Sequence, residues 1–570
     1  MKQKELASLQ TLKVDKNSKS INDKNVVQYF ESFTSQSQSL IFLDISFRDN
    51  KIGDKGASGI AEYIARCLNL SKLKIDLSHN MIKENGFIDL CNSLGNCLNI
   101  LSLELNLIHN QIADNEFQNK PKLFCLTHLN SLYIQLGQNK IGDKGANFLS
   151  TTILQCDNAN KLVLNIEKNN ISDQGALILA EGIAKCTNLT QLDINFDIQE
   201  MKSQTKQNFF TSLKTTKLNK LSFGFEINSQ VSNELMTGIT EIKNLNNLKL
   251  NFKDIQEKQS EIAGKQIGKL VNLSSLSISF DKKIQADNIA NILSRLIKCV
   301  NLLDLQIELQ ANHACLSEYN NFLSHLTNLK TLIVSCQQIL LCYISLSFLQ
   351  LMFCKIKSDQ VSYDSLSITH LSKGIACCGS LESLEIYLEE LSNDQITILG
   401  NGIGQCKKLV NLKLQLQGTS IGDCGVKKLG KQLGLCSNLK NIDIDFEHNQ
   451  ICDAGIFYFL KKLSKAALLE SMKLNLGKNI VCVDDSSSIG QGLCLFYNLK
   501  SLDINLNDTD IDNERARQLG QSLISCQNIT TLRYNISCCQ FLEEEGIYDF
   551  ENQIKKMKKL VKQTYYSYYD

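Results

Sequence analysis

The amino-acid sequence repeats a short leucine pattern about every thirty residues along nearly its whole length. The pattern is C-x-x-L-x-x-L-x-L-x-L, and the stretches that follow it most closely begin at Cys67, Cys97, Cys186, Cys299, Cys378 and Cys436. The first residue of the L-x-L-x-L core, called the anchor from here on, is Leu43, Leu73, Leu103, Leu132, Leu162, Leu192, Leu221, Leu248, Leu276, Leu305, Leu332, Leu349, Leu384, Leu412, Ile442, Met472, Leu502 or Leu532. Anchors lie 27–30 residues apart except around Leu349, where the intervals are 17 and 35. Such a period indicates a repeat array rather than a set of independent domains.

Each repeat reads as a strand, a turn and a helix. The core alternates apolar residues with period 2, which predicts a strand with one buried face. The second half changes to helical spacing, as in GASGIAEYIARC, where Ile60, Ile64 and Cys67 share one helix face. Alternating strands and helices form a parallel sheet with right-handed crossovers. Because one repeat cannot bury both of its apolar faces alone, the repeats must stack into a solenoid.

The turn between strand and helix carries the motif I-x-D-x-G. It occurs at residues 52–56, 141–145, 171–175, 421–425 and 451–455. An aspartate before a helix accepts hydrogen bonds from the unpaired N–H groups of the first turn, so we expect each Asp to cap the helix that it precedes. The alternative interpretation is a series of cation-binding aspartates, which we rank below capping.

Two further columns of residues follow the repeat. Six residues before the anchor stand Cys67, Cys97, Cys156, Cys186, Cys299, Cys378, Cys406, Cys436 and Cys526. Seven residues after it stand Asn50, Asn80, Asn110, Asn139, Asn169, Asn228, Asn312, Asn449 and Asn479. A small apolar thiol packs well in a core, and an inward Asn pairs backbone groups that a turn leaves open, each of which costs about 1–3 kcal/mol when buried alone. We therefore expect both columns to be structural, with looser turns where Gln199, Lys283 or Leu391 replaces the Asn.

These motifs resemble the leucine-rich repeat family, and repeats of 27–30 residues with a full helix look like its ribonuclease-inhibitor-like subfamily. The resemblance covers roughly residues 37–550. It implies an α/β horseshoe of about 18 repeats, with a parallel sheet on the concave face and helices on the convex face. The family includes inhibitors, sensors, scaffolds and GTPase activators, so the resemblance leaves the function open.

The pattern divides the chain into five regions. Residues 1–36 are expected to form a polar segment and cap, residues 37–331 and 384–541 two blocks of repeats, and residues 332–383 an irregular region with either a misplaced strand or a kink. Residues 542–570 are expected to form a basic capping helix with a Tyr-rich tail. The apolar stripe of that helix is Ile547, Phe550, Ile554, Met557 and Val561, and a calmodulin-type or membrane-surface helix is the alternative.

Composition excludes several classes of function. Lys and Arg total 60 and Asp and Glu total 59, which argues against a general nucleic-acid or anionic-membrane binder. No apolar run is long enough to span a bilayer, no secretory or mitochondrial leader is evident, and no CxxC occurs among the 22 cysteines. Phosphate-binding glycine loops and H-E-x-x-H are absent as well. We therefore expect a cytoplasmic protein that is not an enzyme and has no cofactor and no metal site.

The solvent-facing strand positions, one, three and five residues after each anchor, carry more acids than bases. One residue after the anchor, charges alternate as Glu385, Lys413, Asp443, Lys473, Asp503 and Arg533, which predicts a self-compensating ladder between strands about 4.8 Å apart. The acids that remain are the predicted partner-binding residues, Glu167, Asp193, Asp197, Glu226, Asp281, Glu389, Asp445 and Glu447.

Two functions fit these features. The first is a non-catalytic protein–protein interaction scaffold that binds a basic partner on the concave face by electrostatic attraction. The second is a regulator or activator of a small GTPase, similar to Ran-type GTPase activators in repeat length. Those activators carry an acidic tail, whereas residues 551–570 are rich in lysine. A solvated face that binds nothing is the third possibility. If a partner does bind, the scarcity of aromatic residues and arginine at the solvent-facing strand positions predicts moderate, salt-sensitive affinity.

Overall fold

The computed structural model describes residues 10–565 except 116, 118–125, 127, 157, 198–200, 225, 229–231, 310–325, 327, 337–352, 359–364, 389–390 and 481–488. Pro121, Gln199, Asn312, Leu349 and Glu389 therefore lie outside the described residues. The chain divides into two compact halves, Met1–Leu273 and Ser274–Asp570, and each half is described by itself.

The N-terminal half alternates strands and helices from its first described residues. Its elements are β1 (Thr11–Asp15), α2 (Asp23–Glu31), η1 (Thr34–Ser39), β2 (Phe42–Ser46), α3 (Asp54–Ala65), β3 (Lys72–Asp76), α4 (Glu84–Leu94), β4 (Ser102–Asn106), β5 (Ser131–Gln135), α5 (Asp143–Leu154), β6 (Lys161–Asn165), α6 (Asp173–Lys185), β7 (Gln191–Asn195), α7 (Ser203–Ser212), η3 (Leu213–Thr215), β8 (Lys220–Phe223), α8 (Ser232–Ile239), β9 (Asn247–Phe252) and α9 (Glu257–Ile267).

The C-terminal half continues the same order. Its elements are β10 (Ser275–Phe280), α10 (Ala286–Leu293), η4 (Ser294–Lys298), β11 (Asp304–Leu309), β12 (Thr331–Cys336), β13 (Phe353–Ser358), α12 (Ser365–Cys377), β14 (Ser383–Tyr387), α13 (Asn393–Ile403), β15 (Asn411–Gln415), α14 (Asp423–Leu433), β16 (Asn441–Asp445), α15 (Asp453–Leu463), β17 (Ser471–Asn475), α16 (Ile489–Leu493), β18 (Ser501–Asn505), α17 (Asn513–Ser525), β19 (Thr531–Asn535), α18 (Glu544–Ile554) and β20 (Lys562–Tyr565).

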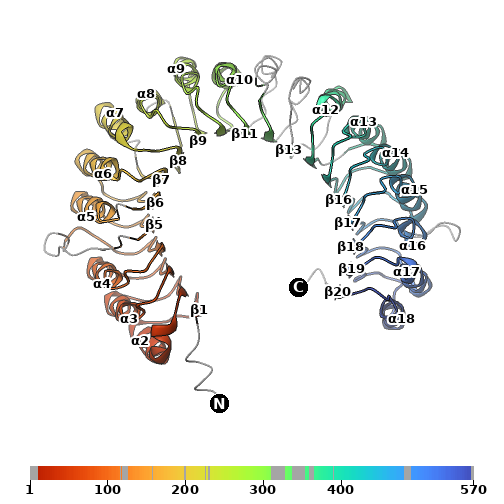
Figure 1. Cartoon of the computed structure of the whole chain (residues 1–570), viewed down its shortest axis with the longest axis horizontal. Coiled ribbons are helices and arrows are strands. Elements are labelled where there is room, and N and C mark those ends of the chain that lie inside the picture. The colour runs from red at the N-terminus through yellow and green to blue at the C-terminus, as the bar shows by residue number, and fades with distance from the viewer. Residues whose placement is uncertain are drawn as a thin grey trace. The chain divides into compact units, whose positions relative to one another are not determined.

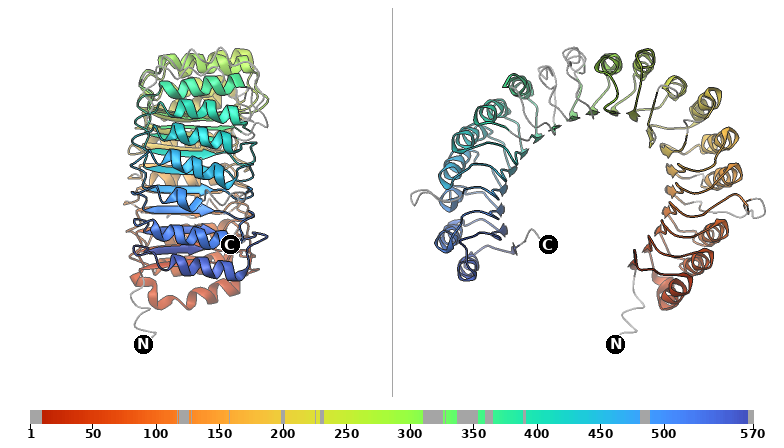
Figure 2. Two further views of the ribbon diagram at one scale, coloured as in Figure 1. Left: turned by 90° about the vertical axis from the view of Figure 1, so that its right-hand side faces the viewer. Right: turned by 180° about the vertical axis from the view of Figure 1, so that it is seen from behind.

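Consecutive strands pair in parallel within each half, with the anchors opposite one another. Leu43 lies opposite Leu73 in the N-terminal half, and Leu412 lies opposite Ile442 in the C-terminal half. In each half the strands line the inner side of an arc and the helices cover its outer side (Figure 1 and Figure 2). Anchor residues are buried between these two layers, where each large apolar side chain contributes about 1.5–3 kcal/mol. The fold is therefore a leucine-rich repeat solenoid, as the sequence predicts.

The asparagine column joins each turn to the preceding repeat. The Ile52 backbone N–H donates to Asn80 Oδ1 (2.9 Å), and Asn80 Nδ2 donates to the carbonyls of Phe47 (2.9 Å) and Leu77 (3.1 Å). Equivalent contacts are made by Asn50, Asn110, Asn139, Asn169, Asn449 and Asn479. The predicted structural role of these asparagines is confirmed.

The residue six positions after the anchor, directly before seven of these asparagines, adopts a left-handed backbone conformation. This position has positive φ at Asp49, His79, His109, Gln138, Lys168, Gly418, His448 and Lys478. Left-handed residues turn the chain sharply, so the side chains at this position project in succession from the edge of the sheet.

The aspartates of the I-x-D-x-G motif cap a different helix from the one predicted. Asp54 is the first residue of its own helix, and its Oδ1 accepts the backbone N–H groups of Lys83 (2.8 Å) and Gly86 (3.0 Å), which begin the helix of the next repeat. Asp143 and Asp423 act on the following repeat in the same way. The prediction of capping was right and the predicted partner was wrong, because the stacking of repeats brings each carboxylate beside its neighbour's helix.

The glycine of the same motif is explained by this cap. A Cβ at Gly175 would lie 2.3 Å from Asp143 Oδ1, and one at Gly455 would lie 2.1 Å from Asp423 Oδ1. The motif therefore forms a contact between repeats. One repeat supplies the Asp, and the Gly of the next repeat leaves room for its carboxylate.

The cysteine column is buried, as predicted. Cys67, Cys97, Cys406 and Cys436 are each at most 1% exposed. Their thiols point at backbone carbonyl oxygens, as between Cys97 Sγ and Ile64 O (3.3 Å). Burial raises the pKa of the Cys67 thiol to about 12 and that of Cys97 to about 11. These thiols are packing groups rather than nucleophiles.

The structure corrects the expected register in the irregular region and the expected ends. Strand β13 aligns Cys354 with Leu332 and Leu384, so the anchor there is Cys354 rather than Leu349. The N-terminal segment contains a strand and a helix of its own, β1 and α2, and β1 pairs with β2. At the other end, α18 stops at Ile554 instead of continuing to Val561, and β20 follows.

Candidate functional site

The first solvent-facing column forms part of the predicted charge ladder. Ion pairs join Lys74 to Glu104 (2.9 Å), Lys355 to Glu385 (2.9 Å) and Lys413 to Asp443 (3.7 Å). Tyr387 lies between two of these lysines, with the amines of Lys355 and Lys413 4.9 and 5.5 Å from its ring centroid. Partly exposed pairs of this kind contribute about 0–1 kcal/mol each, and they leave little net charge in the column.

Three of the predicted partner-binding acids lie around one hollow in the N-terminal half. Glu167, Asp197 and Glu226 line a space of about 1260 Å³. These residues follow β6, β7 and β8, three strands that are neighbours in Figure 1. The wall of the hollow continues along the turn into α6, where it includes Asp173, and it holds two lysines, Lys168 and Lys202. Residues that are up to 59 positions apart in sequence thus face a common space. Four acids and two lysines line it.

Each of these three acids also contacts the protein itself. Asn195 Nδ2 donates to Glu167 Oε2 (2.8 Å), and the backbone N–H of Asn169 donates to Asp197 Oδ2 (3.2 Å). Glu226 forms an ion pair with Lys253. The sequence-based expectation that these acids lack a counter-charge is therefore wrong for Glu226, because Lys253 of the next repeat reaches across to it.

The fourth acid of this group, Asp193, lies apart from the hollow. It sits in the middle of β7, opposite Ser222 of β8. Burial raises the pKa of its carboxyl group, against the opposing effects of Lys249 and a hydrogen bond from Ser222. Asp281, in the C-terminal half, accepts the backbone N–H of Lys283 (3.0 Å) and closes a turn. Glu389 lies outside the described residues.

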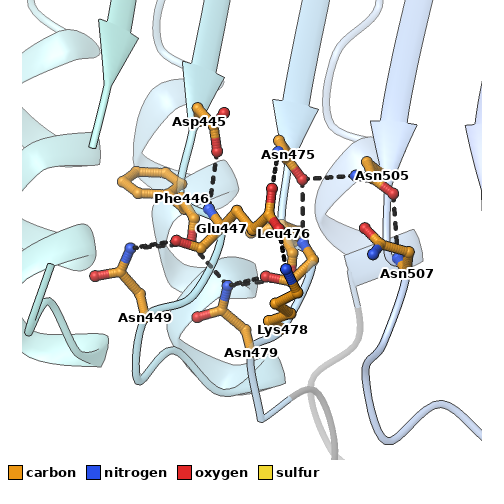
Figure 3. A network of polar contacts seen from close by, with 11 residues as sticks. Asp445, Phe446, Glu447, Asn449, Asn475, Leu476, Lys478, Asn479, Asn505 and Asn507 are labelled. Carbon is orange, nitrogen blue, oxygen red and sulfur yellow. Dashed lines mark hydrogen bonds and ion pairs between the residues drawn. The ribbon is translucent and has the colours of Figure 1, made fainter. Parts of the chain in front are cut away.

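Asp445 and Glu447 form a different kind of cluster in the C-terminal half (Figure 3). Asp445 Oδ1 accepts the backbone N–H of Glu447 (2.9 Å), and burial raises the pKa of the Asp445 carboxyl group. Glu447 is only 7% exposed. Its carboxylate accepts from Asn475 Nδ2 (3.1 Å) and forms an ion pair with Lys478 (2.8 Å).

This cluster contradicts the expectation that Glu447 is an uncompensated acid. Lys478 occupies the left-handed position of the next repeat, which is not one of the three solvent-facing strand positions. The signal was present in the sequence, because Lys478 follows its anchor Met472 by a fixed six residues. Glu447 is therefore a neutralised structural residue.

Beside this cluster, the inner face of the C-terminal half has a small hollow of about 220 Å³. Its charged walls are Asp443, Asp445 and Asp503 together with Lys413 and Lys473. Acids and lysines alternate there because the hollow lies directly over the charge ladder. Its mixed charge gives no preference for a partner of one sign.

Neither a metal centre nor a membrane span stands out in the part of the chain that the structure describes. No three His, Cys, Asp or Glu side chains there are grouped in a way that could hold a metal ion. None of the helices there is both long and apolar enough to cross a bilayer. The N-terminal hollow is therefore the candidate site, and what it offers chemically is acidic hydrogen-bond acceptors.

Comparisons with known proteins add little to this description. No family model matches the sequence, and no curated protein matches it either. Among solved structures, the chain is similar to the one described as "Crystal structure of TLR13-ssRNA13 complex". That likeness covers 96% of this chain and 94% of the other, with 14% identity and a TM-score of 0.40.

Proposed function

We propose that this protein is a non-catalytic, cytoplasmic scaffold whose N-terminal half binds a protein partner through lysine or arginine side chains. The observation that supports this best is the convergence of Glu167, Asp197 and Glu226 on one hollow. Leucine-rich repeat solenoids generally offer extended inner surfaces to ligands, and this hollow lies at the edge of such a surface.

The electrostatics of the hollow favour a basic side chain. Asp197 and Glu226 are exposed, so their carboxylates reach solvent although each also holds one contact within the protein. Lys202 is largely exposed and lies 4.0 Å from Asp173, and the four acids of the wall outnumber its two lysines. Negative charge gathered in a concavity raises the association rate of a positively charged partner.

The finer assignments are part of the same proposal. Repeats of about thirty residues with full helices are consistent with the ribonuclease-inhibitor-like subfamily. Free thiols, as at Cys67 and Cys97, are consistent with the reducing environment of the cytoplasm.

The proposal is tested with peptides rather than with an unidentified partner. A library of twelve-residue peptides is selected on the wild-type protein, and the affinity of the strongest binders is measured by fluorescence anisotropy at increasing salt. We expect enrichment of Lys and Arg and weaker binding at high salt, because screening acts on exposed charges. The variant D197N/E226Q should bind these peptides about tenfold more weakly, which corresponds to about 1.4 kcal/mol.

A matched variant separates the site from net charge. E62Q/E181Q removes two exposed acids from helices α3 and α6 and changes the total charge by the same amount, so its affinity should equal that of the wild type. Peptides without basic enrichment, or equal losses in both variants, would contradict the proposal. Acceleration of single-turnover GTP hydrolysis by substoichiometric protein would instead favour regulation of a small GTPase.

A further inference from the structure

Two histidines from neighbouring repeats meet at the edge of the N-terminal sheet. His79 follows β3 and His109 follows β4, thirty residues later. Their Nδ1 atoms are 3.0 Å apart, and their ring centroids are 4.7 Å apart with the planes inclined at 64°. His109 is exposed and His79 is half-buried, so the pair is open to solvent. Neither residue belongs to the acidic hollow.

The backbone holds this pair in place. Both residues adopt the left-handed conformation, with φ of 56°. The N–H of His79 donates to Ile108 O (2.8 Å), and the N–H of His109 donates to Gly137 O (2.9 Å). The residues that follow them, Asn80 and Asn110, belong to the buried asparagine column. The two imidazoles therefore start from fixed positions and lose little backbone freedom when they bind a common ligand.

The separation of the two nitrogens fits a metal ion with ligands at right angles. With metal–nitrogen bonds of about 2.0–2.1 Å, such an ion holds neighbouring nitrogens about 2.9 Å apart, whereas a tetrahedral ion holds them about 3.4 Å apart. We propose that His79 Nδ1 and His109 Nδ1 form a bidentate site for a divalent transition-metal ion of the Ni²⁺ or Cu²⁺ class, which favours right-angled nitrogen ligands.

Binding involves a change of tautomer and a turn of the rings that directs both Nδ1 lone pairs at the ion. In the unliganded pair one Nδ1 carries a proton and donates it to the other Nδ1, since two bare lone pairs would repel. When the ion binds, the donor ring carries its proton on Nε2 instead and both rings stay neutral. No oxidation and no net proton transfer is involved. Among the described residues no third His, Cys, Asp or Glu completes a group of three, so water fills the remaining positions of the ion.

A third histidine provides a matched control. His448 occupies the same left-handed position, with φ of 57°. The corresponding residues of the repeats before and after it are Gly418 and Lys478, neither of which is an imidazole. His448 therefore reproduces the backbone, while it lacks the second nitrogen ligand.

The experiment uses the untagged full-length protein and Ni²⁺ as the probe. Affinity is measured by isothermal titration calorimetry for the wild type and for H79N, H109N and H448N. Asn is chosen because it tolerates the left-handed conformation better than Ala. We expect H79N and H109N each to weaken the strongest Ni²⁺ site about tenfold or more, and H448N to leave it unchanged.

A second measurement does not depend on any variant. In protein labelled with ¹⁵N only at its seven histidines, paramagnetic Ni²⁺ should broaden the resonances of His79 and His109 together, before that of His448. The proposal is wrong if wild-type affinity persists in either single variant, if H448N weakens binding as much as the others, or if the two resonances do not broaden together.

Discussion

The same repeat position carries Glu167 in the N-terminal half and Glu447 in the C-terminal half, with opposite consequences. Each glutamate accepts a hydrogen bond from the asparagine at the end of the following strand, Asn195 at 2.8 Å and Asn475 at 3.1 Å. Glu447 also pairs with Lys478. At the equivalent position, six residues after Leu192, the sequence carries Ile198, which has no charge.

The two halves therefore share the hydrogen bond from asparagine to glutamate but differ in the counter-charge. Of the two glutamates, Glu447 is the one that pairs with a lysine of the following repeat. The hydrogen bond from the next strand fixes the direction of the glutamate in both halves. In the C-terminal half a lysine of the following repeat then neutralises the carboxylate. Six residues after Leu192 the sequence carries no lysine that could do the same for Glu167.

The largest expected effect compares the asparagines under the two glutamates. Asn449 donates to Leu416 O and Phe446 O and accepts the N–H of Ile421, and it is 7% exposed. N449A leaves these buried groups unpaired and should lower the free energy of unfolding by about 3 kcal/mol. N169A removes the equivalent contacts at a half-buried position, where water replaces part of the loss, so about 1–2 kcal/mol is expected. Urea denaturation measures both, and equal losses would contradict the comparison.

The second prediction concerns Asp453, a capping aspartate of the C-terminal half. Burial raises the pKa of its carboxyl group to about 6, although a hydrogen bond from the Ile489 backbone opposes the shift. Because this pKa lies above the value of about 3.9 in the unfolded chain, the native state binds more protons between about pH 4 and 6. This group therefore adds stability as the pH falls through that window and costs stability above it.

The substitution that tests this is D453N, which keeps the acceptor for Ile489, as the natural Asn393 does for Gly422. The free energy of unfolding of D453N minus that of the wild type should increase by about 2 kcal/mol as the pH rises from 4 to 7.5. Thermal or urea unfolding across that range measures this difference. D143N, at a half-exposed position of the N-terminal half, is the control. If the difference in unfolding free energy between the wild type and D453N stays constant with pH, the raised pKa of Asp453 is wrong.

The smallest expected effect concerns the lysines. K478M removes the counter-charge of the buried Glu447 and should cost about 1 kcal/mol, since Lys478 itself is 44% exposed in its side chain. K253M leaves the exposed Glu226 in water and should cost no more than a few tenths of a kcal/mol, while it strengthens binding of basic peptides to the hollow. Adding E447Q to K478M should restore stability, and a failure to do so would place the loss in the aliphatic part of Lys478.

The sequence predicts the repeat, the direction of its strands and the role of its asparagines, because these depend on contacts at one fixed offset. It misplaces the anchor at Leu349 because residues 335–356 offer several apolar alternations, and the strand that forms there has Cys354 in the anchor column. In that region the register is set by pairing with the neighbouring strands β12 and β14, whose anchors are Leu332 and Leu384. The local apolar pattern does not determine it.

The candidate site was predictable in part for the same reason. Glu167, Asp197 and Glu226 are at the position five residues after their anchors, so the sequence places them in one column, and the structure brings them to one hollow. Lys253 and Lys478 could be paired with their acids only by aligning one repeat with the next. The His79–His109 contact is also of this kind, since the two residues are adjacent in space only because the repeats stack in register.

The aspartate cap has a consequence for how such a chain can change in length. Where the cap is present, a repeat gives a carboxylate to its successor, as Asp54 does for Gly86 and Asp143 for Ser172. A gene duplication or deletion that spans one whole period joins a donor to an acceptor of the same kind, so the array grows or shrinks without compensating substitutions. An insertion out of phase would separate the two partners at that junction, and selection against such insertions would keep the period near thirty residues.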